Sequence, residues 1–319
     1  MHLVMGAGEF LGQNVSRAMA SDVPVIELHS DADDETLADA LSGIEVIVNC
    51  AETASPSRRL RVRKGPSHVL QRMVEAATRA RVRRIVHVST ADVYGSNHFA
   101  RITDKSILKP VHAYERLKLA EEEWLLENAG DIEVVILRPA RVFGEGEEWM
   151  ITHLVTAALH GRVRLPGGGR AQQTFVAAAD VGRACLAASD RGRPGHRYLI
   201  GGFDSTWREY LTSAARALGV AAEIGSVPYD LAYLRALGVE TMKPEGAAVW
   251  PGIYAVDVIG KPHFCDDSHS RRELTWSPSV GSFEQEMPLM ADRLTRIPEV
   301  AAALAEMTVP APATSPPGR

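Results

Sequence analysis

The stretch MHLVMGAGEFLG, residues 1–12, decides the fold of this chain. The apolar run His2–Met5 predicts a strand, and Phe10–Ala20 has the apolar spacing of a helix. Three glycines separate the two elements, namely Gly6, Gly8 and Gly12. Glycines at such a turn let the backbone approach a phosphate group closely, while the helix N-terminus offers free N–H groups. Because any tight strand-to-helix turn can use glycine, the turn alone indicates such a site only weakly.

Beyond this turn, short β-branched runs alternate with helical segments, which is typical of a parallel sheet covered by helices. Strands are expected at Val25–Leu28, Glu45–Cys50, Arg84–Ser89, Glu133–Leu137, Arg162–Leu165 and Arg197–Ile200. Helices are expected at Glu35–Leu41, Pro66–Arg79, Ala113–Asn128, Trp149–His160, Asp180–Ala188, Trp207–Leu218, Tyr229–Leu237 and, last, Phe283–Leu294. The segment between Gly12 and Val46 has room for one strand only, so we expect the sheet to be one strand short.

Composition and length restrict the function. The chain has 319 residues, of which 45% are hydrophobic and 24% charged, as in an ordinary soluble globular protein. Its net charge of -5 gives no reason to expect nucleic acid as a partner, and no apolar stretch approaches the roughly 20 residues of a membrane span. The chain begins directly on a structural motif, which leaves no room for a signal peptide. We therefore expect a cytoplasmic protein.

The three cysteines, Cys50, Cys185 and Cys265, match no metal-ligand or disulfide spacing, and we expect no metal site. Cys50 lies inside the apolar run 46–51, so we interpret it as a small buried core residue and not as a nucleophile.

Two further segments carry polar groups suited to proton transfer. In VHVSTADVYG, Thr90 follows a buried strand, where ligands bind in open α/β sheets. In HAYERLKLAEE, Tyr114 and Lys118 are four residues apart, so both point from one face of a helix. Taken singly, the first is more often a turn residue and the second an ordinary surface pair. Their combination, with Thr90 lying 24 positions before Tyr114 and LRPARVFG following the next strand, favours a catalytic centre.

With these motifs the sequence resembles the extended short-chain dehydrogenase/reductase family, which includes nucleotide-sugar epimerases and dehydratases, 3β-hydroxysteroid dehydrogenases and dihydroflavonol reductases. The resemblance extends from Met1 to about Pro298, with Thr90 at the Ser/Thr position, Tyr114 and Lys118 at the YxxxK motif, and Arg138–Pro139 at the RP motif. HFCDDSHSRRELTWSPSV, near the C-terminus, resembles a further family segment.

The resemblance implies a Rossmann-type doubly wound parallel sheet with a small C-terminal substrate lobe. The dinucleotide-binding core would span residues 1–145 and be completed by 174–200. Residues 146–173 and 201–307 would form the lobe, and the Pro-rich residues 308–319 a disordered tail.

The resemblance also implies an NAD(P)-dependent oxidoreductase that interconverts a ketone and a secondary alcohol. Tyr114 would exchange a proton with the substrate, and the ammonium of Lys118 would lower the phenol pKa and hold the nicotinamide ribose. Thr90 would orient the substrate oxygen, and hydride transfer would belong to the cofactor, NADP or NAD.

Further contacts follow from the same resemblance. Cofactor contacts are expected at Gly6, Gly8, Phe10, Leu11, Gly12, Ala51, Lys118 and Pro139, and substrate contacts at Tyr94, Arg141, Phe175 and Trp250. Nucleotide-sugar members often carry an arginine where this chain has Gln172 and Gln173, so we expect a non-nucleotide small molecule with apolar or ring character. A homodimer is expected by analogy only.

The chain departs from the family in its cofactor half. Glu9 stands where the family's turn has its middle glycine, and it either crowds a pyrophosphate or turns away while Gly8 provides the close approach. If Val25–Leu28 is the second strand of the sheet, its tip is His29–Ser30, without the acid that holds a ribose 2′-hydroxyl. That absence favours NADP slightly, although no arginine follows to bind a 2′-phosphate. If the run is instead the third strand with its helix, the second strand is missing.

The basic run RRLRVRK, residues 58–64, either binds phosphate or an acidic substrate, or is a solvated loop. Three functions therefore stay open. The leading one is the oxidoreductase, and the second is a redox-neutral isomerase, lyase or cyclase that uses the Tyr/Lys pair without ordinary dinucleotide binding. The third is a non-catalytic scaffold, which the survival of all three polar residues disfavours.

Overall fold

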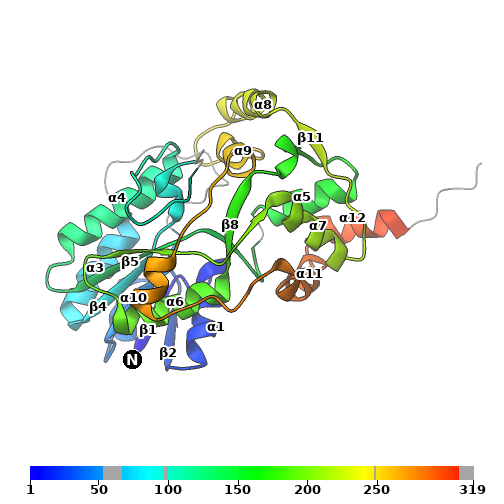
Figure 1. Ribbon diagram of the computed structural model, residues 1–319. Coiled ribbons are helices and arrows are strands. Elements are labelled where there is room, and N and C mark those ends of the chain that lie inside the picture. The colour runs from blue at the N-terminus through cyan, green and yellow to red at the C-terminus, as the bar shows by residue number, and fades with distance from the viewer. Residues whose placement is uncertain (53–66, 97–99, 148, 248, 309–319) are drawn as a thin grey trace, which may run out of the picture.

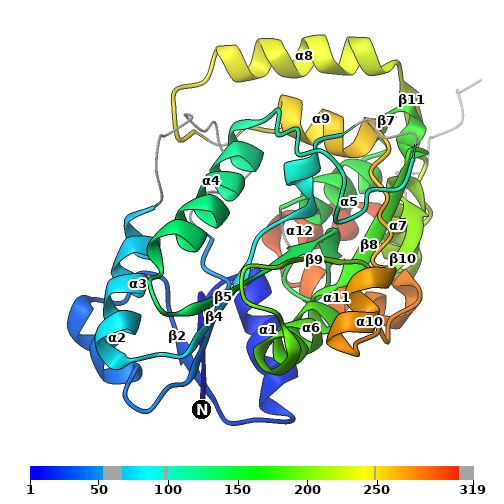
Figure 2. The same cartoon turned by 60° about the vertical axis from the view of Figure 1, so that its left-hand side comes forward.

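A six-stranded parallel sheet forms the centre of the larger part of the molecule (Figures 1 and 2). The computed structural model describes residues 1–52, 67–96, 100–147, 149–247 and 249–308. In spatial order the strands are β2 (Val25–Leu28), β1 (His2–Met5), β3 (Val46–Asn49), β4 (Arg84–Val88), β5 (Glu133–Pro139) and β9 (Arg197–Ile200). The chain leaves β1 towards β2 and then returns to the other side of β1 at β3. This reversal creates the crevice at the strand ends where ligands bind in such sheets.

Helices cover both faces of this sheet because its strands are apolar on both sides. On one face, α1 (Phe10–Ala20), α6 (Ala178–Arg191) and α10 (Ser268–Leu274) pack around the buried valines of β1, β3 and β4. On the other face lie α2 (Asp34–Ala40), α3 (His68–Ala80) and α4 (Ala113–Asn128), which bury Leu37, Met73 and Leu125.

A smaller lobe follows, with its own apolar core and two short sheets. The three-stranded sheet has the order β10 (Phe203–Thr206), β8 (Gln172–Ala177) and β6 (Arg141–Phe143), and the two-stranded sheet pairs β11 (Gly225–Val227) with β7 (Arg164–Pro166). The lobe's α-helices are α5 (Ile151–Leu159), α7 (Trp207–Ala217), α8 (Tyr229–Thr241), α9 (Ile253–Gly260), α11 (Met287–Leu294) and α12 (Pro298–Thr308). Three 3-10 turns complete the described elements, η1 (Ala91–Tyr94), η2 (Gly167–Gly169) and η3 (Phe283–Gln285). Aromatic rings from β6, β8, α7 and η3 meet in the lobe's core.

The position of β2 decides between the two alternatives for Val25–Leu28. Because β2 pairs with β1 in parallel register, it is the second strand of the sheet, and its tip is His29–Ser30. In the described residues no strand lies beyond β2, so the sheet ends there.

Other expectations need correction. The expected last helix Phe283–Leu294 divides into η3 and α11, and α12 follows it. Arg162–Leu165 begins two residues later as β7. Residues 174–177 belong to β8 in the lobe's small sheet, so within 174–200 only β9 joins the six-stranded sheet.

The basic run 58–64 and residues 309–319 of the expected tail lie outside the described residues. Among the helices that are described, none combines the length and the apolar character needed to cross a membrane.

Candidate functional site

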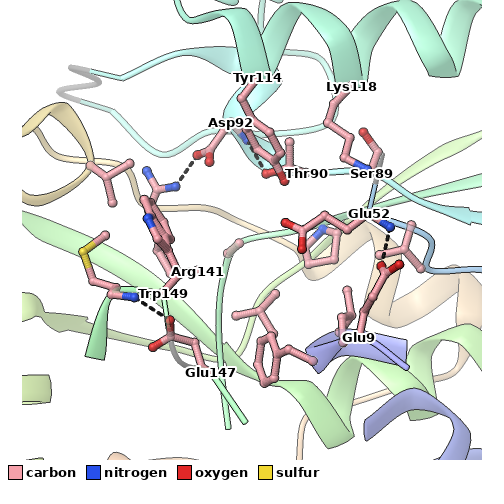
Figure 3. Close-up of a pocket in the computed structure, with 18 of the residues that line it drawn as sticks. Glu9, Glu52, Ser89, Thr90, Asp92, Tyr114, Lys118, Arg141, Glu147 and Trp149 are labelled. Carbon is pink, nitrogen blue, oxygen red and sulfur yellow. Dashed lines mark hydrogen bonds and ion pairs between the residues drawn. The ribbon is translucent and has the colours of Figure 1, made fainter. Parts of the chain in front are cut away.

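A cavity of about 340 Å³ lies at the carboxyl ends of β3, β4 and β5, between the large sheet and the smaller lobe. This volume is at the lower end of the range for small-molecule sites. Figure 3 shows Tyr114 and Lys118 reaching into it from α4, with Arg141 and Trp149 on another side and Glu9 on a third. Its remaining polar walls come from Glu52, Ser89, Thr90, Asp92 and Glu147.

Thr90 lies directly after β4, where the chain turns into η1. Its hydroxyl oxygen accepts a hydrogen bond of 3.1 Å from the backbone N–H of Asp92. This bond caps the turn, as the ordinary structural interpretation predicts. It also leaves the hydroxyl hydrogen available to an acceptor in the cavity, because the oxygen is here the acceptor.

Tyr114 and Lys118 lie one turn apart on α4, and both line the cavity. Lys118 is buried, and its Nζ is 3.6 Å from a carboxylate oxygen of Glu121. The pKa of Tyr114 is raised well above 10.0 by withdrawal from water and by the carboxylates of Glu52, Asp92 and Glu121. Several acids surround the phenol and the Lys118 ammonium lies near Glu121, so the net direction of the Tyr114 pKa is upward. That Lys118 by itself lowers this pKa stays a prediction.

Asp92 organises the wall between the sheet and the lobe. One of its carboxylate oxygens accepts a hydrogen bond from Nη1 of Arg141, and the other accepts one of 2.5 Å from the hydroxyl of Tyr254. Burial alone would raise the pKa of Asp92, but Arg141, His263 and Tyr254 together lower it. The ring of Tyr254 also contacts that of Tyr114, with 5.6 Å between centroids. Asp92 thus links the end of β4 to the lobe beside the phenol.

A second buried ion pair holds α4 against the sheet. Arg138, on β5, donates to both carboxylate oxygens of Glu122 on α4, at 2.6 to 3.2 Å. Its Nη1 donates to the hydroxyl of Tyr94 at 2.8 Å. Tyr94 is 1% exposed and does not line the cavity. The arginine of the RP motif therefore fixes the helix that carries Tyr114, and Tyr94 supports this arginine from outside the cavity.

The glycine turn brings α1 close to the sheet. A Cβ atom at Gly12 would lie 1.9 Å from the carbonyl oxygen of Gly6, and Gly6 itself has a φ of +87° against the backbone of Ala51. Glycine is therefore required at both positions. Phe10 and Leu11 line the cavity. They are the first residues of α1, so the positive, N-terminal end of this helix faces the cavity.

Glu9 precedes α1 and turns away from it. Its side chain makes no capping bond to its own helix. One carboxylate oxygen accepts a hydrogen bond of 2.6 Å from the hydroxyl of Ser30 at the tip of β2, and the other accepts one from the backbone N–H of Glu52 after β3. Glu9 is thus directed across the strand ends and not to solvent, so of the two orientations expected from the sequence it takes the one that crowds a pyrophosphate.

Only part of the predicted site lines the cavity. Thr90, Tyr114, Lys118, Phe10, Leu11, Pro139 and Arg141 do so. Gly6, Gly8 and Gly12 belong to the turn after β1, and Ala51, after β3, backs Gly6. Phe175 and Trp250 pack among the lobe's aromatic rings. Cys50 is buried, as expected, and also reaches the cavity wall.

Sequence reasoning missed Asp92, Glu52, Glu147, Trp149 and Tyr254. For Asp92 a signal existed, because it stands two residues after Thr90 at a strand end.

The fold and the polar groups around the cavity together define a Rossmann-type enzyme of the extended short-chain dehydrogenase/reductase class. The chain belongs to the NAD dependent epimerase/dehydratase family, whose match covers residues 2–201. Members of this family are enzymes, among them epimerases, dehydratases and a ketoreductase.

Two relatives illustrate the range of similarity. The chain is 29% identical over 258 residues to 4-hydroxy-2-methyl-3-oxo-4-farnesyl-3,4-dihydroquinoline-1-oxide ketoreductase of Stigmatella aurantiaca, covering 77% of this chain and 76% of the relative. It is 28% identical over 256 residues to sterol demethylase protein B of Methylococcus capsulatus, covering 67% and 75%. Among solved structures, a UDP-glucuronic acid 4-epimerase from Bacillus cereus, in complex with UDP-glucuronic acid and NAD, has a TM-score of 0.68 at 19% identity. That alignment covers 92% of this chain and 99% of the epimerase. At this identity the likeness concerns the fold.

Proposed function

We propose that this protein is a reductase that converts a ketone of a small, non-nucleotide, ring-containing molecule to a secondary alcohol, with Tyr114 as the proton donor. The observation that carries the proposal is the position of Tyr114 and Thr90 together on the wall of a cavity at the carboxyl ends of the strands. The ketoreductase relative of Stigmatella aurantiaca supports the same reaction type.

The raised pKa of Tyr114 is consistent with a phenol that is neutral at pH 7 before the reaction. A phenol whose pKa lies well above 10.0 is neutral at pH 7 and carries the proton that an oxygen gaining negative charge requires. Thr90 orients that oxygen through its free hydroxyl hydrogen. Asp92 and Arg141 hold Tyr254 beside the phenol and so fix the ring. The cavity therefore places a neutral phenol and a hydroxyl donor where a carbonyl oxygen could accept from both.

The catalytic end of the cavity fits a nicotinamide cofactor, which supplies the hydride when it is bound. Lys118 would hold the ribose hydroxyls, and Pro139 and the uncapped first turn of α1 would contact the ring and the first phosphate. At the adenosine end the fit requires Glu9 to move. The lack of an acid at the tip of β2, His29–Ser30, favoured NADP, but Glu9 brings a carboxylate to Ser30. A 2′-phosphate would meet that charge, and we therefore propose NADH as the better ligand of the two.

The substrate class is inferred from the lobe's side of the cavity. Trp149, Trp207 and Tyr254 line it there, and flat apolar walls favour a ring. Gln173 is buried and joins Nε of Arg141 to the backbone carbonyl of Lys261, so it supports the wall and offers no charge to a nucleotide phosphate. A neutral or weakly polar ring compound is the substrate these walls favour.

One observation favours the redox-neutral alternative, an isomerase, lyase or cyclase. Glu52 lines the same cavity, and its pKa is raised by partial withdrawal from water and by the nearby Glu9, although Lys118 opposes this. A carboxylate with a raised pKa opposite a neutral phenol forms an acid–base pair that needs no hydride.

The test is a spectrophotometric assay of NADH oxidation with a panel of cyclic ketones. Tyr114→Phe should lower kcat by about 10² to 10⁴, the usual contribution of a general acid. Tyr233→Phe removes a hydroxyl from α8 that does not line the cavity, so it is the matched control and should keep full activity. Equal rates for the native protein and Tyr114→Phe would exclude Tyr114 as the donor. Conversion of a ring substrate with no NADH consumed, lost in Glu52→Gln, would favour the alternative.

A further inference from the structure

The carboxylate of Glu9 lies in the crevice at the reversal of strand order, between the tips of β2 and β3. Its two hydrogen bonds, from the Ser30 hydroxyl and from the Glu52 N–H, join strands that lie on opposite sides of β1. In open α/β sheets, dinucleotides cross this crevice with their phosphates at the N-terminus of the first helix. Glu9 therefore places a negative charge in the path that such a ligand takes.

The polar groups at this place are already used by the protein itself. The Ser30 hydroxyl, at the tip of β2, donates to Glu9 and not to a ligand. The ring of His29 packs on Gly8 so closely that a Cβ there would lie 2.4 Å from Nδ1. The space beside the Gly8 backbone, which a phosphate could otherwise approach, is thus filled by the imidazole of His29.

The cavity itself ends at this contact. Glu9 and Glu52 line it (Figure 3), and so does Phe10, whereas Gly8, His29 and Ser30 are not among its lining residues. Among the described residues, the cavity therefore covers the chemical end of a ligand's path and reaches no further than Glu9 towards the adenosine side.

The charge balance of the wall also disfavours phosphate. Among the described residues that line the cavity, the acids are Glu9, Glu52, Asp92 and Glu147 and the cations are Lys118 and Arg141. Arg141 is engaged by Asp92, and Lys118 lies near Glu121. The raised pKa of Glu52 has Glu9 among its causes, so the two carboxylates already repel each other. A pyrophosphate brings further negative charge to the same place.

We propose that Glu9 is an internal anion that closes the adenosine end of the cleft, so that a dinucleotide binds weakly and only after Glu9 has left Ser30 and Glu52. The inference concerns the same cleft as the proposed function and rests on it only for the choice of ligand. It predicts a gain of affinity when the carboxylate is removed, which is unusual for a substitution in a binding site.

The experiment is a titration of the full-length protein with NADH and with NADPH, followed by the fluorescence of the bound cofactor. With an effective dielectric constant of about 20, repulsion between the Glu9 carboxylate and a neighbouring phosphate should change the affinity by about tenfold to a hundredfold. Glu9→Gly should therefore bind NADH more tightly by about that factor, and Glu9→Gln by less, because the amide keeps the bulk. Glu35→Gln, which removes an exposed carboxylate from the first turn of α2, is the matched control and should bind like the native protein. Thermal unfolding with and without NADH checks that each variant is folded and reports binding independently.

Three results separate this inference from the proposed function. Micromolar binding by the native protein, with no gain in Glu9→Gly, would overturn the inference and leave the reductase proposal standing. Tight binding by Glu9→Gly without reduction of any ketone would support the inference and count against the reductase. If neither the native protein nor Glu9→Gly binds NADH or NADPH, the inference is overturned, because removal of the carboxylate should open the cleft to a dinucleotide.

Discussion

Replacement of Asp92 by alanine should destabilise the protein more than any exposed ion pair can. The change removes the partner of the Arg141 guanidinium and of the Tyr254 hydroxyl, and both Asp92 and Arg141 are at most 7% exposed. Loss of one member of a buried pair costs about 3 to 5 kcal/mol, because the other charge remains without compensation. For a protein whose free energy of unfolding is about 5 to 15 kcal/mol, this is a large fraction.

Urea unfolding measures this cost, and a double-mutant cycle identifies its origin. The variant Asp92→Ala/Arg141→Met removes both charges, so it should be more stable than the sum of the single changes predicts, by about 2 kcal/mol. Arg17→Ala breaks an exposed pair with Glu145 and should cost less than about 1 kcal/mol. If Asp92→Ala costs no more than Arg17→Ala, or if the two changes at the pair are additive, the buried ion pair does not hold the lobe to the sheet.

The remaining predictions concern pH and packing. Burial lowers the pKa of His112, but the hydrogen bond with Asp257 outweighs it and raises the pKa above 6.5. The protonated His112 therefore contributes stability that is complete below pH 6.5 and is lost as the pH rises through the pKa of the folded state. The difference in unfolding free energy between the native protein and His112→Gln should therefore shrink with rising pH, and a constant difference would exclude this link between α4 and α9. Gly12→Ala should lower the free energy of unfolding by about 3 kcal/mol, because the new Cβ would meet the Gly6 carbonyl. Gly238→Ala, on the open side of α8, should raise it by about 0.5 to 1 kcal/mol. Chemical denaturation measures both variants, and similar losses of stability would contradict the packing of the turn.

The fold could be predicted from local pattern because its signals are local. Short, mostly apolar strands alternate with helices along the first part of the chain, a glycine turn joins the first pair, and β1 and α1 have the predicted bounds. The helix α12 was not predicted, because the Ala-rich segment after Pro298 has little apolar periodicity. Its burial depends on a contact with α5 that lies far back in the sequence.

The candidate site was only half predictable. The spacing of Tyr114 and Lys118 determines that they share a face of α4, but not which charges surround that face. Glu52 follows β3 and Asp92 lies in η1 after β4, and these acids, together with withdrawal from water, make the net direction of the Tyr114 pKa upward. Glu9 could be recognised as unusual from its place among the glycines, but its hydrogen bonds with Ser30 and Glu52 depend on which strands lie next to β1.

The central claim is that Tyr114 is a neutral proton donor, and its ionisation tests this most directly. The ultraviolet absorbance of tyrosinate, recorded as a pH titration of the native protein minus that of Tyr114→Phe, isolates this phenol. We predict no ionisation of Tyr114 up to pH 10.0, because withdrawal from water and the carboxylates around the cavity hold its pKa well above that value. A difference signal that titrates below pH 10.0 would contradict the account, since Tyr114 would then be a phenolate stabilised by Lys118.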